Sequence, residues 1–365
     1  MPYSLSSSFL LSQESSAPIV PVAWRYLKPI LSIILLLLCP GCTITEGPDF
    51  ETRPIPQDFG WSPDGRYFLF VSDYEGEFFP YALDLQDDVL IQLDDRPAFS
   101  RPFTFAPDGT QVAFPSPGIS GSNITVYDFH QYEAFDIVTD TDLGDNLSWS
   151  HDGQQLFYVH ESHHELRTYV FATQSVERLL PLPETALRLA LAPNDTFLAG
   201  ILDHTIYLLD LAIGTVTEWQ DNSICGTQLN WLPDASAITF QSCREGEKQL
   251  AGLEIATGQR LEYELTRFGA GFSPWSPAGD KFLFGGLNPE GGDEIMVWDR
   301  LTGTTDQVTS TPDLAVAYPF WSPDGQQIIY WTGTPGIADE GSNLEKLHII
   351  NRDGSGQREL LNLYP

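Results

Sequence analysis

The chain repeats one short sequence motif that predicts a turn. The motif is most easily recognised in its last copy, Trp-Ser-Pro-Asp-Gly at 321–325. Proline presets φ at the second position of a type I turn, aspartate suits the third position, and glycine takes the positive φ needed next. The run Gln-Ile-Ile-Tyr-Trp at 327–331 follows and is rich in β-branched and aromatic residues. This combination predicts the inner hairpin of an antiparallel sheet.

Seven copies of the turn follow one another, with spacings of 44, 44, 42, 40, 44 and 46 residues between their first residues. A period of about 40 to 50 residues built from short strands is typical of a β-propeller with four strands in each blade. The sequence therefore predicts an all-β fold, a seven-bladed propeller of four-stranded antiparallel blades over 58–365, with six or eight blades as alternatives. The copies begin at Trp61, Phe105, Trp149, Leu191, Trp231, Trp275 and Trp321.

Two copies depart from the pattern at the glycine position, where Asp195 and Ala235 stand instead. Aspartate tolerates the left-handed conformation, so we expect the turn at Asp195 to keep its shape. Alanine would be strained there, and we therefore expect the turn at Ala235 to adopt another type.

A second pattern follows each hairpin, because the third strand of the unit often ends in an acidic residue. We expect these carboxylates to accept backbone hydrogen bonds where the strand enters the next turn, which is a structural role. The residues concerned are Asp84, Asp128, Asp210 and Asp299.

The N-terminal region has the organisation of an export signal. Arg25 and Lys28 precede an apolar run at 29–38 that is too short to span a bilayer as a helix. The pair Gly41-Cys42 resembles the lipobox of bacterial lipoproteins, although Cys39 stands where that motif usually has leucine. We predict a lipoprotein-type signal peptide at 1–41, lipidation of Cys42 and a tether at 42–57. A plain membrane anchor or an ordinary signal peptide is the alternative.

Two further cysteines, Cys225 and Cys243, lie symmetrically about Asp234 in the turn of the fifth copy. In a regular hairpin they face one another across the strand pair, close enough for a bridge. An exported protein would oxidise them, so we predict a disulfide. Two buried free thiols in separate strands are the alternative.

Charge is the strongest signal in the composition. Residues 43–365 carry 16 basic and 49 acidic side chains, a balance of −33. Such a surface repels phosphate backbones, which argues against nucleic acid as a partner. Solubility explains the charge most simply, and attraction of cations or basic partners is the alternative.

No catalytic motif stands out in the sequence. There is no nucleophile elbow, phosphate loop or dinucleotide fingerprint. The histidines at 160, 163 and 164, with Glu161 and Glu165 between them, are residue types that bind zinc or copper, but they fall in a loop where solvated polar residues are expected. The Asp-Gly pairs could suggest calcium, yet turn geometry accounts for them. We therefore predict no metal and no cofactor.

Propellers usually bind ligands at the mouth of the central channel or on the adjoining loops, and the strand before each turn is the innermost one. Five polar residues occupy the same place on different blades, three residues before the first residue of the turn. Convergent polar groups at a channel mouth are the default ligand-binding hypothesis. The alternative is that they satisfy backbone groups at the strand starts. These candidates are Asp58, Asn146, Arg188, Gln228 and Tyr318.

The Trp-Ser-Pro-Asp-Gly turn followed by an apolar strand resembles the TolB-type, or WD-like, propeller repeat of bacterial envelope proteins. The resemblance covers about 59–365 and implies a propeller fold and an envelope location. Two departures argue against TolB itself. Only about fifteen residues separate Cys42 from the first repeat, which leaves no room for the α/β domain of TolB, and the copy number is seven where TolB has six blades.

We expect a non-catalytic binding or scaffold propeller, monomeric and lipid-anchored through Cys42 outside the cytoplasmic membrane, with a protein or glycan partner. The alternative is an enzyme at the channel mouth, such as a polysaccharide lyase or hydrolase. Two carboxylates or a metal-spaced histidine set within about 10 Å of one another in the channel would favour that alternative.

Overall fold

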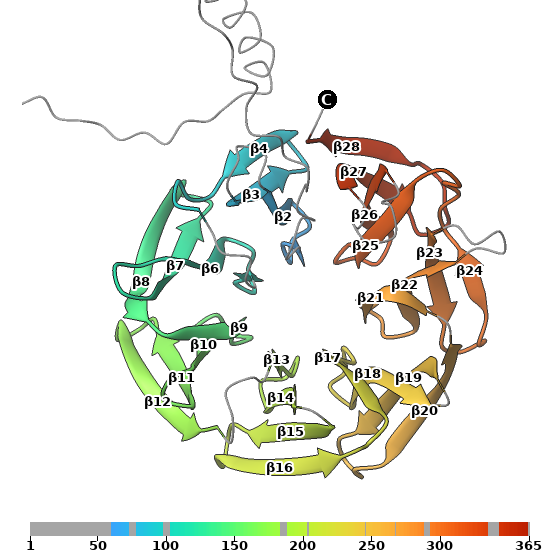
Figure 1. Ribbon diagram of the computed structural model, residues 1–365. Coiled ribbons are helices and arrows are strands. Elements are labelled where there is room, and N and C mark those ends of the chain that lie inside the picture. Colours follow the sequence, from blue (N-terminus) through green and yellow to red (C-terminus); the bar gives the residue numbers. More distant parts are fainter. Residues whose placement is uncertain are drawn as a thin grey trace, which may run out of the picture. The chain divides into compact units, whose positions relative to one another are not determined.

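The computed structural model describes residues 60–72, 78–97, 103–182, 188–202, 204–244, 246–266, 268–287, 293–334 and 343–363. These residues form seven four-stranded antiparallel sheets arranged as the blades of a ring (Figure 1). The predicted seven-bladed all-β propeller is therefore confirmed. The predicted signal peptide, Cys42 and the tether lie outside the described residues, which include no helix long and apolar enough to cross a membrane.

Each blade is built from four consecutive strands. Blades 1 to 4 contain β1(Gly60–Trp61), β2(Tyr67–Ser72), β3(Phe79–Asp84), β4(Val89–Gln92), β5(Thr104–Phe105), β6(Gln111–Pro117), β7(Ser122–Asp128), β8(Glu133–Thr141), β9(Leu143–Trp149), β10(Gln155–His160), β11(Glu165–Val170), β12(Ser175–Pro181), β13(Arg188–Leu191), β14(Phe197–Leu202), β15(Thr205–Asp210) and β16(Thr215–Gln220).

Blades 5 to 7 continue the pattern without interruption. They contain β17(Ile224–Trp231), β18(Ala237–Arg244), β19(Glu247–Glu254), β20(Arg260–Thr266), β21(Phe268–Trp275), β22(Lys281–Leu287), β23(Asp293–Asp299), β24(Thr305–Gln307), β25(Ala315–Trp321), β26(Gln327–Thr334), β27(Asn343–Asn351) and β28(Arg358–Asn362).

The first strand of each blade lies nearest the ring centre and the fourth strand lies on the rim (Figure 1). Because neighbouring strands are antiparallel, the turns from strand one to two and from strand three to four emerge on the same side of the ring. We call this side the turn face. The other connections, within and between blades, emerge on the opposite side, which we call the loop face.

The hydrophobic core lies between the blades. All six residues of β2 are buried, whereas most of the rim strand β8 is exposed. At the contact between blades 7 and 1, the rings of Phe70 and Trp331 meet edge to face with their centroids 5.6 Å apart. Buried second and third strands explain why those segments read as nearly continuous apolar runs in the sequence.

The ring closes between blades 7 and 1 by side-chain packing. β28 pairs with β27 of its own blade, and among the described strands no blade borrows a strand from another. One hydrophobic cluster spans the junction and includes Phe68 from blade 1 and Ile329 from blade 7. The seam therefore resembles the other contacts between neighbouring blades.

The repeated turn has the geometry that its sequence predicts. In blade 1, Ser62 Oγ donates to Asp64 Oδ1 at 2.5 Å, and Gly65 has φ +74° and donates its N–H to the Ser62 carbonyl at 2.9 Å. Asp195 adopts φ +55° in blade 4, which confirms the expectation for that copy.

The expectation that the turn at Ala235 changes type is wrong. Ala235 has φ +57°, and its N–H donates to the Leu232 carbonyl at 2.9 Å, as Gly325 donates to Ser322 at 2.8 Å. Asp234 Oδ1 accepts both the N–H and the hydroxyl of Ser236, at 3.0 and 2.7 Å. The hydrogen bonds of the hairpin therefore hold alanine in a conformation that it adopts only at a cost.

Neighbouring turns touch around the turn face. A Cβ added to Gly325 would lie 3.3 Å from Cδ of Pro277, and one added to Gly279 would lie 3.3 Å from Pro233. Between blades 3 and 4 both residues differ, because His151 replaces the proline and Asp195 replaces the glycine. The His151 N–H, which proline would lack, donates to Asp195 Oδ2 at 2.7 Å.

Candidate functional site

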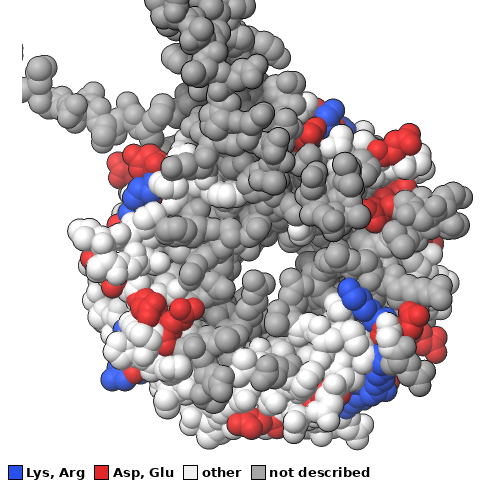
Figure 2. All heavy atoms as spheres, viewed as in Figure 1, with Lys and Arg blue, Asp and Glu red and all other residues white. Residues whose placement is uncertain are grey.

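The channel-mouth candidates occupy the innermost strands. Asn146 lies in β9, Arg188 begins β13 and Gln228 lies in β17, but their side chains are outside the described part of the structure, as is the whole of Asp58. Because these four side chains are not described, the role of Asp58, Asn146, Arg188 and Gln228 in ligand binding stays a prediction. In a space-filling view the centre of the ring is hollow (Figure 2).

Tyr318 is the one candidate with a described side chain. It lies in β25 with φ +51°, at a β-bulge between Ala317 and Phe320. Its half-buried ring packs against the cluster that joins blades 7 and 1, and burial raises the pKa of its phenol. This placement gives Tyr318 a packing role at the ring seam.

The acidic residues that end the third strands cap the next turn, as predicted. Asp84 Oδ1 accepts the N–H groups of Gln86 and Asp87 at 3.0 and 3.2 Å. Asp299 does the same for Leu301 and Thr302, and its hydrogen bond from Lys281 lowers its pKa to about 2.

The histidine cluster lies on the loop face, after β10. The Nδ1 atoms of His160 and His163 are 3.1 Å apart, and burial is the first cause that lowers the pKa of His160. Among the described residues no group of three or more histidine, cysteine or acidic side chains is arranged to hold a metal ion.

Cys225 and Cys243 form a disulfide that joins β17 to β18, with a Cα–Cα distance of 5.7 Å. They are not directly opposite, because the register shifts between Ile224 and Leu229 and Ile224 pairs with Ser242. The bridge is therefore diagonal across a β-bulge, where the sequence symmetry predicted a facing pair.

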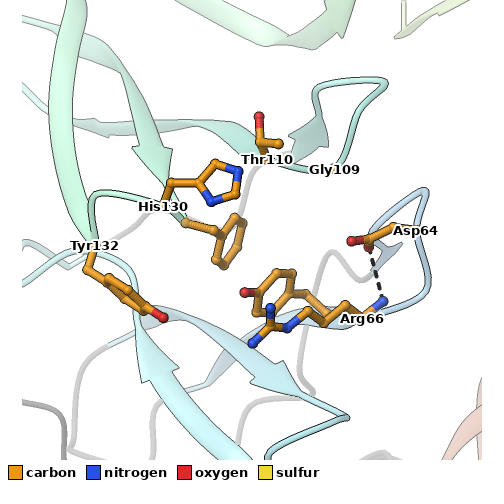
Figure 3. Close-up of a pocket in the computed structure, with 8 residues that line it drawn as sticks. Asp64, Arg66, Gly109, Thr110, His130 and Tyr132 are labelled. Atoms are coloured by element: carbon orange, nitrogen blue, oxygen red, sulfur yellow. Dashed lines mark hydrogen bonds between the residues drawn. The ribbon is translucent and has the colours of Figure 1, made fainter.

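A pocket of about 170 Å³ opens on the turn face between blades 1 and 2 (Figure 3). Blade 1 contributes its first turn and the start of β2, and blade 2 contributes its β5–β6 and β7–β8 turns. Sequence reasoning missed this site. The residues that line the pocket are Asp64, Arg66, Tyr67, Gly109, Thr110, Phe129, His130 and Tyr132.

The floor of the pocket is aromatic and one wall is charged. The rings of Tyr67 and Phe129 are buried and stacked, with centroids 4.0 Å apart. The Arg66 guanidinium lies 5.1 Å from the centre of the Tyr67 ring and forms salt bridges with Asp84 at 2.7 Å and Asp87 at 3.0 Å. Its hydrogen bond to Asp84 is the largest cause that raises the pKa of Arg66.

The Asp64 carboxylate fills the place between the two turns. A Cβ added to Gly109 would lie 3.2 Å from this carboxylate, whereas a Cβ added to Gly153 would meet a proline of the preceding blade. Asp64 Oδ1 also accepts the N–H of Arg66 at 3.1 Å, the contact drawn in Figure 3. The junction of blades 1 and 2 therefore presents a carboxylate, where the junctions 2/3, 5/6, 6/7 and 7/1 present a proline ring.

Tyr132 stands at the mouth of the pocket, with 49% of its surface exposed. It has φ +55°, and its N–H donates to the Asp128 carbonyl at 2.8 Å. The equivalent position in blades 4, 5 and 6 is Gly214, Gly258 or Gly303, each with positive φ and the same hydrogen bond to the residue four before it. Comparing this position across the copies of the repeat could have identified Tyr132 from the sequence, because a tyrosine stands where three other copies have glycine.

Comparison with solved structures shows the propeller fold. An oligogalacturonate lyase in complex with manganese is 15% identical, with 80% of this chain and 89% of that chain covered and a TM-score of 0.62. The propeller domain of the trilobed protease from Pyrococcus furiosus is 14% identical, covering 86% of this chain and 99% of that domain, with a TM-score of 0.60.

A TolB-like structure is also among the similar chains. The putative TolB from Agrobacterium tumefaciens is 18% identical, covering 64% of this chain and 86% of that chain, with a TM-score of 0.48. No protein-family model matches the sequence. At these identities the lyase and the protease domain, with TM-scores of 0.62 and 0.60, show the β-propeller architecture alone. A fold of this kind serves many unrelated functions.

Proposed function

We propose that the protein is a binding propeller of the bacterial cell envelope, held outside the cytoplasmic membrane by a lipid on Cys42, with a protein or glycan as its partner. This proposal rests on the structural role that the repeated polar residues have in the blades. Serine and aspartate side chains of the repeated turns make hydrogen bonds within their own turns, which is a structural role. The repeated residues of the seven blades therefore form a scaffold, and the residues that differ between blades are available for recognition.

The disulfide supports an extracytoplasmic location. Disulfides persist in oxidising compartments and are rare in the cytosol, and Cys225–Cys243 joins two neighbouring strands of one blade. The acidic surface supports a partner other than nucleic acid. In Figure 2, acidic side chains form several separate groups around the rim of the face seen, with fewer basic ones between them.

Palmitate labelling tests the anchor. The wild-type chain should incorporate labelled palmitate and fractionate with membranes, and Cys42→Ala should lose both properties. A Cys39→Ala variant is the matched control and should keep the label. Labelling of Cys42→Ala at the wild-type level would refute the lipid anchor.

Crosslinking in envelope extracts tests the binding function. The protein should recover a specific protein or glycan, and an excess of unlabelled propeller should compete for it. A screen that recovers no specific partner, together with turnover of a polysaccharide by the purified chain, would replace the binding function with the enzymatic one.

A further inference from the structure

Three residues of the pocket between blades 1 and 2 have no counterpart of the same type in the other blades: Arg66, His130 and Tyr132. Arg66 follows the turn glycine of blade 1, where blades 2 and 3 carry Thr110 and Gln154. His130 and Tyr132 lie in the β7–β8 turn, which is richer in aromatic residues than its counterparts. Since the common residues maintain the fold, the residues particular to this junction are candidates for a function of their own.

Tyr132 carries a conformational penalty that its packing does not explain. Blades 4, 5 and 6 meet the same backbone requirement with glycine, and blades 1 and 3 meet it with Asp88 and Gln174. Tyr132 is the aromatic residue among them, and a bulky side chain at positive φ is an outlier. Half of the Tyr132 surface is exposed, so burial of the ring does not offset the strain. Strained residues that persist in this way concentrate at ligand sites.

The charges around the pocket favour a neutral ligand. The Arg66 guanidinium is already paired with Asp84 and Asp87, so an incoming anion would have to compete with two carboxylates. A cation would approach the same guanidinium. A polyhydroxyl compound both donates and accepts hydrogen bonds, which suits a wall that offers the Asp64 carboxylate, the Arg66 guanidinium and the His130 imidazole.

The size and the lining favour a single ring. The volume of about 170 Å³ is below the 300 to 1,000 Å³ that is usual for drug-sized ligands. An exposed aromatic ring packs well against a ligand that has an apolar face and polar groups around its edge. A pyranose is such a ligand, because one face of its ring presents C–H groups and its hydroxyls lie at the edge. In Figure 3, Tyr132 and His130 project from one turn on the side opposite Asp64 and Arg66.

We propose that this pocket binds one pyranose unit of a neutral saccharide, with Tyr132 as the stacking platform and Asp64, Arg66 and His130 as its hydrogen-bonding wall. The proposal rests on the binding function given above and assigns the glycan option to a site on the turn face. The channel mouth, on the axis of the ring, is a separate location.

Saturation-transfer NMR on the full-length protein in detergent tests the site. The neutral probes are the methyl glycosides of glucose, galactose, mannose and N-acetylglucosamine, and glucuronic acid and tetramethylammonium are the charged probes. At least one neutral probe should bind, and Tyr132→Gly should weaken it by about tenfold or more through loss of the aromatic platform. The same variant should melt at a higher temperature than the wild type, because glycine relieves the strain.

Gln174→Gly is the matched control, since Gln174 occupies the equivalent turn position in blade 3 with φ +51°. It should raise the melting temperature and leave saccharide binding unchanged. Equal binding by Tyr132→Gly and the wild type, no transfer from any neutral probe, or tighter binding of a charged probe would overturn the proposal. If saccharide binding is absent or is unchanged in Tyr132→Gly while the wild type still recovers an envelope partner in crosslinking, the saccharide site fails and the binding function stands.

Discussion

Blades 5 and 7 reach the same turn with different sequences. Blade 7 has Gly325 at the position of positive φ, and blade 5 has Ala235 there with φ +57°. Blade 5 also contains the Cys225–Cys243 disulfide, which joins the two strands on either side of the unfavourable turn. The difference teaches that the hairpin hydrogen bonds impose the turn even on an unfavourable residue. We infer that the covalent link between the flanking strands offsets part of the cost of Ala235.

Breaking the disulfide tests that compensation most directly and should have the largest effect. In the double variant Cys225→Ser, Cys243→Ser, the free energy of unfolding should fall by about 3 kcal/mol, because the bridge closes a loop with a sequence separation of 18. Chemical denaturation of both proteins measures the change. Indistinguishable unfolding midpoints would show that blade 5 does not depend on its bridge.

Exchanging the turn residues of the two blades should have the next largest effect. Gly325→Ala should lower the free energy of unfolding by about 1–2 kcal/mol, since φ is +66° there and Pro277 is close, while Ala235→Gly should raise it by about 1 kcal/mol. Thermal unfolding gives both values. Gly60→Ala is the control and should not destabilise the protein, as a Cβ at that position meets nothing within 4 Å.

At the junction of blades 3 and 4, His151 and Asp195 replace the usual proline and glycine of neighbouring turns, and changing them should have a smaller effect on stability. His151→Pro and Asp195→Gly each remove one side of the 2.7 Å hydrogen bond, and the double variant restores the residues of the regular junctions. A double-mutant cycle should give a coupling energy of about 0.5–1 kcal/mol, with the double variant more stable than the sum of the single changes predicts. Strict additivity would mean that the two substitutions are independent.

The smallest expected effect is a pH dependence of stability that blade 7 has and blade 5 lacks. Blade 7 contains His348, whereas no histidine is described in blade 5. Burial is the main cause that lowers the pKa of His348, with Lys346 acting the same way and Glu359 opposing it. As the pH falls through about 6.5, the unfolded chain takes up a proton that the folded chain resists, so stability falls. His348→Gln should flatten the dependence between pH 7 and 5. Asp299 stabilises the folded chain above about pH 4, and this contribution is lost as the pH falls from about 4 towards its folded pKa of about 2.

The fold could be predicted from the sequence because the turn residues carry strong local preferences and recur at a regular spacing. The prediction from local preferences was wrong at Ala235, because the hydrogen bonds of the surrounding hairpin outweigh the preference of alanine for negative φ. It also misjudged the alignment of the cysteines, since a β-bulge shifts the register between Ile224 and Leu229. The sequence between Ile224 and Leu229 did not reveal this bulge to an argument based on symmetry about the turn.

The candidate site was harder to predict, because it depends on which blades are neighbours and which side chains point into the gap between them. Tyr132 differs from Gly214 at the same place in the repeat, and that difference was visible in the sequence. Its proximity to Arg66, which lies 66 positions earlier in the chain, required the packing of blade 1 against blade 2. Long-range contacts of this kind are set by topology and leave no local pattern.

Each blade is one uninterrupted stretch of chain, and the described strands of blade 7 end beside those of blade 1 (Figure 1). The folded ring therefore has no unique first blade. A circularly permuted gene that joins blade 7 to blade 1 and opens the chain between β12 and β13 would encode the same seven sheets. In evolutionary terms, the unit of duplication and the unit of assembly coincide, so blades could be gained or exchanged without rebuilding a shared sheet.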